Sequence, residues 1–151
     1  MIQLKRIGHV LLRVADLERS KSFYSDILGF EVVEQDPEHG GVFMTLGESG
    51  HTIDLFPAEN PELSPPSARS RPGLQHIAFQ VESYEALKDA YFTLQERGVE
   101  VTRAMDHVSQ KSIYFDDPDG NGLEIYYELP NALEMFRQGR ADRDEPITFE
   151  R

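Results

Sequence analysis

The sequence contains one order of predicted elements twice, and this internal repeat limits the available folds more than any other feature. Each copy begins with a histidine and an apolar stretch that ends in valine, at residues 8–14 and again at 75–81. Stretches of this kind are typical of strands. A helix and three further strands are predicted after each stretch, in the same order and at nearly the same spacing. The chain is therefore predicted to be an α+β protein with two βαβββ repeats.

Both predicted helices have start and stop signals. Asp16 and Ser83 are suitable N-caps, and Gly29 and Gly98 can end the helices in the left-handed conformation. The other strands flank turns, several of them rich in Gly, Asp and Asn, and are predicted at 30–33, 42–46, 52–56, 99–101, 112–115 and 123–127. Because one repeat leaves a face of its sheet uncovered, two repeats are expected to form a paired, partly closed mixed sheet around a central cleft.

These repeats predict a single domain over residues 1–129. Repeat one occupies 1–57, a proline-rich linker 58–73 and repeat two 74–129. Arg69 and Arg71 in the linker are interpreted as solvated, the alternative being contact with an anionic substrate.

Residues 130–151 follow the repeats as a C-terminal tail. A short helix is predicted at 131–139, and the rest of the tail is mostly charged. Since its apolar side chains cannot form their own core, they are expected to pack on this subunit's cleft or on a neighbour. We predict a homodimer in which the tail is an arm or a lid, and the alternative is a frayed, solvated end.

Composition excludes several classes of protein. The 151 residues include 15 Lys and Arg against 27 Asp and Glu, so the formal net charge is −12. This balance argues against a nucleic-acid partner. No apolar run is long enough to span a membrane, and there is no cysteine for disulfides or thiolate metal sites. With no apolar segment typical of a signal peptide near Met1, the expected compartment is the cytoplasm.

Each repeat also carries a histidine on its first strand and an acidic residue on its last. His9 and Asp54 occupy these positions in repeat one, and His76 and Glu124 in repeat two. A carboxylate among apolar neighbours on a strand has to be exposed, paired or bound to a ligand. Two imidazoles and one carboxylate form a ligand set that suits Fe(II) and also Mn(II). We therefore predict His9, His76 and Glu124 as metal ligands.

The repeats, the paired strand histidines and the segment from Ser112 to Tyr126, with its Asp-Pro-Asp-Gly-Asn-Gly turn, resemble the vicinal oxygen chelate superfamily. That superfamily includes glyoxalase I, extradiol dioxygenases, fosfomycin-resistance enzymes and bleomycin-resistance proteins. The stretch 106–114 most resembles small, single-domain catechol 2,3-dioxygenase-like proteins. This resemblance implies a His, His and Glu site for Fe(II) at His9, His76 and Glu124, and a substrate with vicinal oxygens.

The resemblance also implies two catalytic side chains. A conserved family tyrosine corresponds to Tyr114, and a hairpin centred on the turn independently pairs Tyr114 with Glu124. In repeat one, the equivalent partner of Asp54 is about Phe43. His107 is a candidate acid or base, the alternative being an ordinary loop residue. His39 and His51 are given no role.

The position of Asp54 separates two kinds of chemistry. In glyoxalase I the corresponding residue is a fourth metal ligand, whereas three protein ligands leave room for a bidentate diol and O₂. We favour three ligands, with Asp54 orienting a histidine or a water. The expected activity is thus metal-dependent, extradiol-type cleavage of a catechol-like aromatic. The alternatives are a glyoxalase-type isomerase or lyase or a fosfomycin-type transferase, with Zn(II) or Ni(II) as the metal, and a non-catalytic small-molecule-binding protein.

Overall fold

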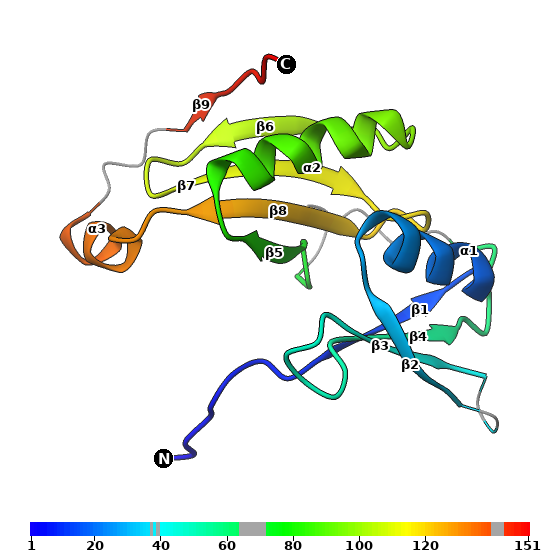
Figure 1. The fold of residues 1–151 in the computed structure, drawn as a ribbon. Coiled ribbons are helices and arrows are strands. Elements are labelled where there is room, and N and C mark those ends of the chain that lie inside the picture. Colours follow the sequence, from blue (N-terminus) through cyan, green and yellow to red (C-terminus); the bar gives the residue numbers. More distant parts are fainter. Residues whose placement is uncertain (37, 39, 64–71, 140–143) are drawn as a thin grey trace. The chain divides into compact units, whose positions relative to one another are not determined.

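The computed structural model describes residues 1–36, 38, 40–63, 72–139 and 144–151, and the chain divides into two compact units. Unit 1 is Met1–Pro65 and unit 2 is Pro66–Arg151. Each unit contains one sheet of mixed strand direction that is not closed into a barrel (Figure 1). The predicted α+β class is confirmed. His39, Arg69 and Arg71 lie outside the described residues.

The sheet of unit 1 has four strands in the order β1-β4-β3-β2. Strands β1 and β4 are parallel and the other neighbours are antiparallel. The elements of this unit are β1 (Val10–Val14), α1 (Leu17–Ser22), the π-helical turn η1 (Phe23–Ile27), β2 (Glu31–Gln35), β3 (Val42–Thr45) and β4 (Ile53–Pro57).

The first helix starts where the sequence predicts and changes its winding before it ends. The Asp16 side chain caps it by accepting a hydrogen bond from the Arg19 backbone N–H at 3.0 Å. The hydroxyl of Ser25 donates to the Lys21 carbonyl at 2.9 Å, inside the stretch where the α-helix gives way to η1. Gly29 follows with φ 79°, as a helix-ending glycine requires.

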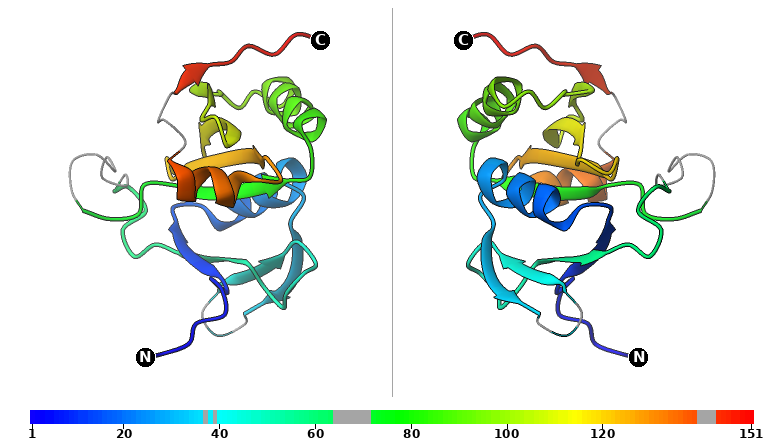
Figure 2. Two further views of the ribbon diagram at one scale, coloured as in Figure 1. Left: turned by 90° about the vertical axis from the view of Figure 1, so that its left-hand side faces the viewer. Right: turned by 90° about the vertical axis from the view of Figure 1, so that its right-hand side faces the viewer.

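The sheet of unit 2 has five strands in the order β5-β8-β7-β6-β9, and α2 lies along one of its faces (Figures 1 and 2). Only β5 and β8 are parallel. The elements of unit 2 are β5 (Ile77–Val81), α2 (Tyr84–Glu96), β6 (Arg103–Asp106), β7 (Gln110–Asp116), β8 (Gly122–Glu128), α3 (Ala132–Gln138) and β9 (Glu145–Pro146).

One predicted strand is displaced. The sequence suggested a strand at 99–101, but β6 begins at Arg103. The Val99 N–H donates to the Leu94 carbonyl and so completes the end of α2, while pairing with β7 starts when the Thr102 N–H donates to the Tyr114 carbonyl. The residues between them form the connection instead of a strand.

Strand alternation gives each sheet one apolar face and one face that carries the chemistry. In unit 1 the buried face includes Val14, Val42, Met44, Ile53 and Leu55. In unit 2 the buried side chains of β7 and β8, Ile113, Phe115, Leu123 and Ile125, lie on the face covered by Leu87 and Leu94 of α2. Successive residues of a strand point to opposite faces of the sheet. The candidate site residues alternate with these apolar residues along the strands and therefore project from the other face of each sheet.

The tail packs on unit 2. Strand β9 pairs with β6, and the Phe149 ring lies 4.8 Å from the ring of Tyr91 and 5.9 Å from that of Tyr84, measured between centroids. Phe149 is only 8% exposed. The predicted helix of the tail is confirmed as α3, whereas β9 was not anticipated. No helix in the described part of the chain is long and apolar enough to cross a bilayer.

Candidate functional site

The two histidine–carboxylate pairs occupy equivalent positions in the two sheets. His9 immediately precedes Val10, which pairs with Ile53, the neighbour of Asp54. His76 immediately precedes Ile77, which pairs with Leu123, the neighbour of Glu124. Parallel pairing of the first and last strands therefore brings each histidine beside the carboxylate of its own unit. The repeat seen in the sequence is thus a repeat of side-chain geometry.

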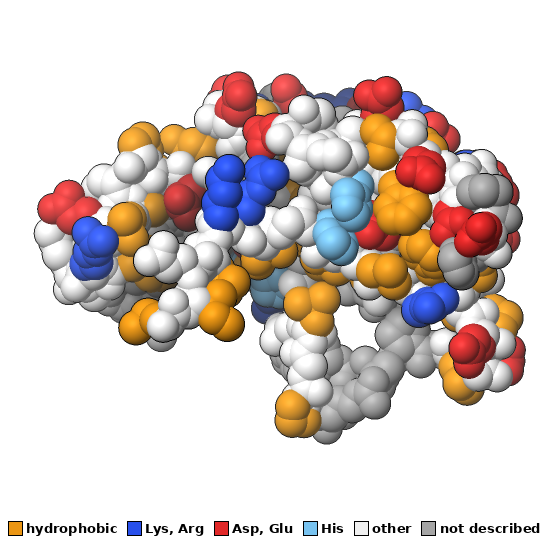
Figure 3. Space-filling view, turned by 90° about the horizontal axis from the view of Figure 1, so that it is seen from below, with side chains coloured by type: hydrophobic (Ala, Val, Ile, Leu, Met, Phe, Trp, Pro, Cys, Tyr) orange, Lys and Arg blue, Asp and Glu red, His pale blue; other side chains and the backbone are white. Residues whose placement is uncertain are grey.

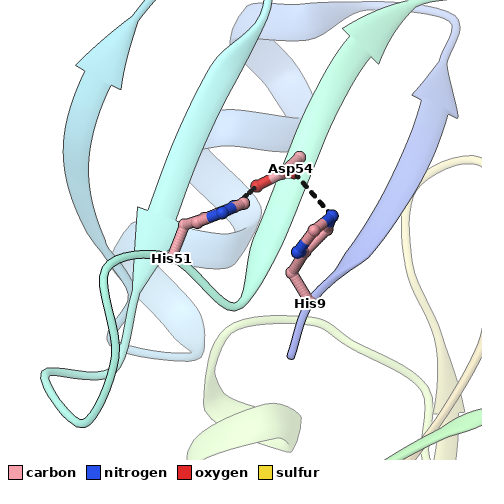
Figure 4. A group of neighbouring side chains, drawn as sticks. All are labelled: His9, His51 and Asp54. Carbon is pink, nitrogen blue, oxygen red and sulfur yellow. Dashed lines mark hydrogen bonds and ion pairs between the residues drawn. The ribbon is translucent and has the colours of Figure 1, made fainter. Parts of the chain in front are cut away.

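Unit 1 holds a group of three potential metal ligands, His9, His51 and Asp54 (Figure 4). Their ligand atoms lie within 4.8 Å of one another. His51 Nδ1 is 2.6 Å from Asp54 Oδ1, and His9 Nε2 is 3.8 Å from Asp54 Oδ2. Since an ionised carboxylate only accepts hydrogen bonds, His51 donates to Asp54 through Nδ1. The two imidazole rings stack at 4.3 Å.

Asp54 is 1% exposed, so its charge depends on these two histidines for compensation. Histidine side chains also gather at one point of the surface in Figure 3, next to hydrophobic side chains. Two imidazoles and a carboxylate are a donor set that fits a divalent transition metal.

Unit 2 holds a tighter pair. His76 Nε2 lies 2.9 Å from Glu124 Oε2, and Gln110 Nε2 donates to Glu124 Oε1 at 3.3 Å. Glu124 is 3% exposed. Two ligands placed about 2.1 Å from one ion at right angles lie roughly 3 Å apart. The 2.9 Å separation therefore suits adjacent ligands on one metal ion.

Tyr114 on β7 is paired with Glu124 on the neighbouring strand β8, so this predicted pairing is confirmed. The predicted pairing of Phe43 with Asp54 in unit 1 is confirmed as well. Burial raises the pKa of the Tyr114 phenol, and the negative charge of Glu124 raises it further. The phenol is therefore protonated and able to donate a hydrogen bond at neutral pH. Arg103 stacks on the Tyr114 ring, with its guanidinium carbon 4.0 Å from the ring centroid.

His107 connects Tyr114 to the tail. Its Nε2 lies 2.9 Å from the Tyr114 hydroxyl and its Nδ1 lies 2.6 Å from Asp144 Oδ1. The turn that carries His107 is strained, because Val108 is a β-branched residue with φ 69°. The Asp106 carboxylate accepts a hydrogen bond from the Val108 N–H at 2.8 Å and fixes this turn.

A pocket of about 250 Å³ opens onto this group. It is lined by His76, His107, Gln110, Tyr114, Glu124, Phe136 and Asp144. A second hollow of about 280 Å³ shares His76 and Tyr114 with it and is also lined by Gln75, Thr102 and Arg103. The residues of unit 2 thus form a pocket for a small molecule beside the imidazole–carboxylate pair.

The sequence-predicted residues fall into two sets. His76, Glu124, Tyr114 and His107 line one pocket of unit 2. His9 and Asp54 belong to unit 1, where they lie together. The sequence analysis gave His51 no role and did not single out Asp144. The i, i+3 spacing of His51 and Asp54 was a usable signal for the first, whereas nothing local marks Asp144 as a partner of His107.

Comparison with known proteins places this arrangement in a family. The family model described as "Glyoxalase/Bleomycin resistance protein/Dioxygenase superfamily" matches residues 6–125. The chain belongs to this superfamily. The resemblance drawn from the sequence is therefore confirmed. Superfamily members are metal-dependent enzymes that act on small molecules.

Individual relatives differ in activity. The chain is 32% identical over 126 residues to the catechol-2,3-dioxygenase of Bacillus subtilis, covering 83% of this chain and 42% of that protein, and so spans less than half of that relative. It is 33% identical over 139 residues to the metallothiol transferase FosB of Staphylococcus saprophyticus, with coverages of 89% and 85%. A crystal structure of a glyoxalase/dioxygenase from Nostoc punctiforme superposes with a TM-score of 0.67 at 25% identity, covering 83% of this chain and 92% of that one.

Proposed function

We propose that this superfamily member is an extradiol-type dioxygenase that cleaves the ring of a catechol-like aromatic. The observation that carries the proposal is the pocket in which the buried His76–Glu124 pair lies beside Tyr114 and His107. An isomerisation or a transfer reaction would not by itself require this tyrosine–histidine chain next to the carboxylate. The similarity to a catechol-2,3-dioxygenase supports the same chemistry.

The proposed metal is Fe(II), held by His76, Glu124 and His9. Such an ion would supply Lewis-acid chemistry, lowering the pKa of a vicinal diol held beside it. Gln110 holds one oxygen of Glu124 and so orients this carboxylate. Tyr114 and His107 hold and move the proton that the diol releases, between the phenol oxygen and the imidazole Nε2.

Two sets of metal ligands are compatible with the position of His9. In the first, His9 joins His76 and Glu124, as the sequence predicted. In the second, His9 acts with His51 and Asp54 of its own unit. We favour the first, because His51 already donates to Asp54 and the His9–Asp54 distance of 3.8 Å is longer than the His76–Glu124 distance. Asp54 then orients the histidines of unit 1.

Metal analysis of variants separates these arrangements. Protein purified anaerobically is stripped with a chelator and reloaded with Fe(II) or Mn(II), and its metal content is measured. We expect His9→Ala, His76→Ala and Glu124→Gln to lose the metal, and His51→Ala to keep it. Asp54→Asn should weaken affinity by about 10–100-fold. Glu128→Gln, four residues along the same strand, is the control for charge.

Retention of the metal by His76→Ala and Glu124→Gln, together with its loss from His51→Ala, would move the site to unit 1. Circular dichroism of each variant identifies any that fail to fold.

Turnover tests the reaction itself. The Fe(II)-loaded protein is mixed with a panel of catechols in air, and O₂ uptake and ring-cleavage absorbance are followed together. The proposal expects one O₂ consumed per catechol, and no consumption by the metal-free protein. Metal-loaded protein that is inert toward the whole panel but active with a thiol and an epoxide would contradict it.

That second outcome would identify the protein as a metal-dependent thiol transferase. The observation in favour of this alternative is that the chain spans 85% of FosB but only 42% of the catechol-2,3-dioxygenase. Stimulation by Mn(II) or Zn(II) with an added thiol, and without O₂ uptake, is its signature. Isomerisation of a hemithioacetal to a thioester would instead indicate a glyoxalase-type enzyme.

A further inference from the structure

One carboxylate of the C-terminal segment, that of Asp144, contacts the candidate site. Asp144 Oδ1 lies 2.6 Å from His107 Nδ1, although 37 residues separate them in the sequence. Asp144 also lines the pocket that contains His76 and Glu124. The predicted site residues did not include it.

Asp144 is positioned by a paired strand. The next two residues, Glu145 and Pro146, form β9 and pair with Asp106 and Met105 of β6. The Ile147 N–H then donates to the Ala104 carbonyl at 3.1 Å. Phe149 is buried against α2, so the segment has an apolar anchor beyond the strand. These contacts place the Asp144 backbone beside the turn that bears His107.

The two contacts of His107 define where its proton lies. An ionised carboxylate only accepts hydrogen bonds, so the proton of a neutral imidazole is on Nδ1, which faces Asp144. Nε2 then presents its lone pair toward the Tyr114 hydroxyl, which lies 2.9 Å away and can donate to it. Without Asp144, the imidazole is free to carry its proton on Nε2. The Tyr114 hydroxyl would then have to accept instead of donate.

We propose that Asp144 is a positioning residue that fixes the tautomer of His107 and so keeps Nε2 available as the acceptor of the Tyr114 proton. This inference rests on the proposed function, in which Tyr114 and His107 handle a substrate proton. It extends that function by assigning a site role to the C-terminal segment. Asp144 acts through His107 and has no assigned contact with substrate.

The test reads the tautomer directly in the full-length protein. Histidines are labelled with ¹⁵N, and long-range proton–nitrogen spectra are recorded at a pH where the imidazoles are neutral. The His107 signals are assigned by their absence from His107→Gln. In the wild type we expect a single Nδ1–H form. In Asp144→Asn and Asp144→Ala we expect the Nε2–H form to become a major population.

Glu145→Gln is the matched control, because it removes the same charge from the adjacent, exposed residue of the segment. It should leave the His107 spectrum unchanged. An unchanged spectrum in both Asp144 variants, or the same change in Glu145→Gln, would overturn the proposal. Because this measurement needs neither metal nor substrate, it stands even if the proposed reaction is wrong.

Kinetics supply the second measurement. On a catechol that the wild type turns over, Asp144→Asn should lower kcat by about tenfold or more with KM and metal content little changed. This is part of the roughly 100- to 10,000-fold that a general acid or base contributes. Asp144→Glu should restore part of the loss by returning the carboxylate. A rise in KM alone, or equal loss in Asp144→Glu and Asp144→Ala, would show that the segment only shapes the pocket.

Discussion

At the scale of one residue, Glu124 shows how a buried carboxylate is accommodated on a strand of this fold. Its carboxylate is nearly inaccessible to water, and its two oxygens contact His76 and Gln110. A buried charge that loses its partner is strongly destabilising. Strand pairing also places Tyr114 directly opposite, so the same backbone register positions the carboxylate, the imidazole and the phenol.

Removal of the Tyr114 hydroxyl should separate metal binding from catalysis. Tyr114→Phe deletes the group that donates to His107 while keeping the ring on which Arg103 stacks. We expect unchanged metal content and a kcat lower by about 100-fold or more, as for loss of a proton-transfer group. Metal analysis and steady-state turnover of the same preparation check this, and wild-type turnover would remove the role assigned to the hydroxyl.

Asp116 should limit stability at neutral pH. Partial burial of the carboxyl group raises its pKa, and the charges of Asp117 and Glu100 raise it further. A folded-state pKa above the unfolded one gives stability that is present at low pH and lost as the pH rises through the folded value. Because Asp116 is largely exposed, the effect is small, less than about 0.5 kcal/mol.

Asp116→Asn removes this effect and should raise the thermal midpoint slightly at pH 7, by about 1–2 °C. The gain should disappear below about pH 4, where the wild-type carboxyl is protonated. Thermal melts at both pH values measure it, with Glu31→Gln on β2 as an exposed control. A variant that is less stable at pH 7 would show that the Asp116 charge has an unrecognised partner.

At the scale of elements, the turn from Asp117 to Gly122 sets the register of the strands that bear the site. Asp117 accepts hydrogen bonds from the backbone N–H groups of Asp119 and Asn121 and from the Asn121 side chain. The turn thus leads directly into β8, which carries Glu124. At its end, Gly122 lies against the backbone next to His76: a Cβ atom there would be 2.6 Å from the Gln75 carbonyl oxygen.

Gly122→Ala should therefore push β5 away from β8 at the point where His76 meets Glu124. The obstacle is backbone, so relief requires strand movement, and we expect a loss of about 1–3 kcal/mol in unfolding free energy. Metal affinity should fall as well. Chemical denaturation and metal titration measure the two effects. Gly50→Ala, in a turn with nothing close to the added methyl, is the control and should change neither.

At the scale of the whole molecule, each of the two units carries a histidine–carboxylate pair on one face of its sheet. A ligand that binds only the folded chain stabilises it by mass action. The metal should therefore act on the thermal stability of the entire protein. The homodimer predicted from the sequence stays a prediction, and light scattering of the full chain checks it.

Addition of Mn(II) to chelator-treated protein should raise the unfolding free energy by about 2.7 kcal/mol at a free metal concentration 100 times the Kd. Differential scanning calorimetry across a metal titration measures this shift. The effect should be absent in His76→Ala and preserved in His51→Ala. An equal shift in wild type and His76→Ala would mean that the ion binds elsewhere.

Features that depend on local pattern could be predicted from the amino-acid sequence. The caps at Asp16 and Ser83, the α+β class and the pairing of Tyr114 with Glu124 follow from side-chain periodicity and turn composition, which act over a few residues. The repeat likewise revealed which histidines and carboxylates are equivalent. Together these features identify the superfamily.

Contacts between groups far apart in the chain depend instead on how the strands and helices pack. The contact of Asp144 with His107 depends on the pairing of β9 with β6 and on Phe149 packing against α2. The approach of His9 to Asp54 depends on the parallel pairing of β1 with β4. Such contacts arise from the packing of segments far apart in the chain, and periodicity within a single segment carries no information about them.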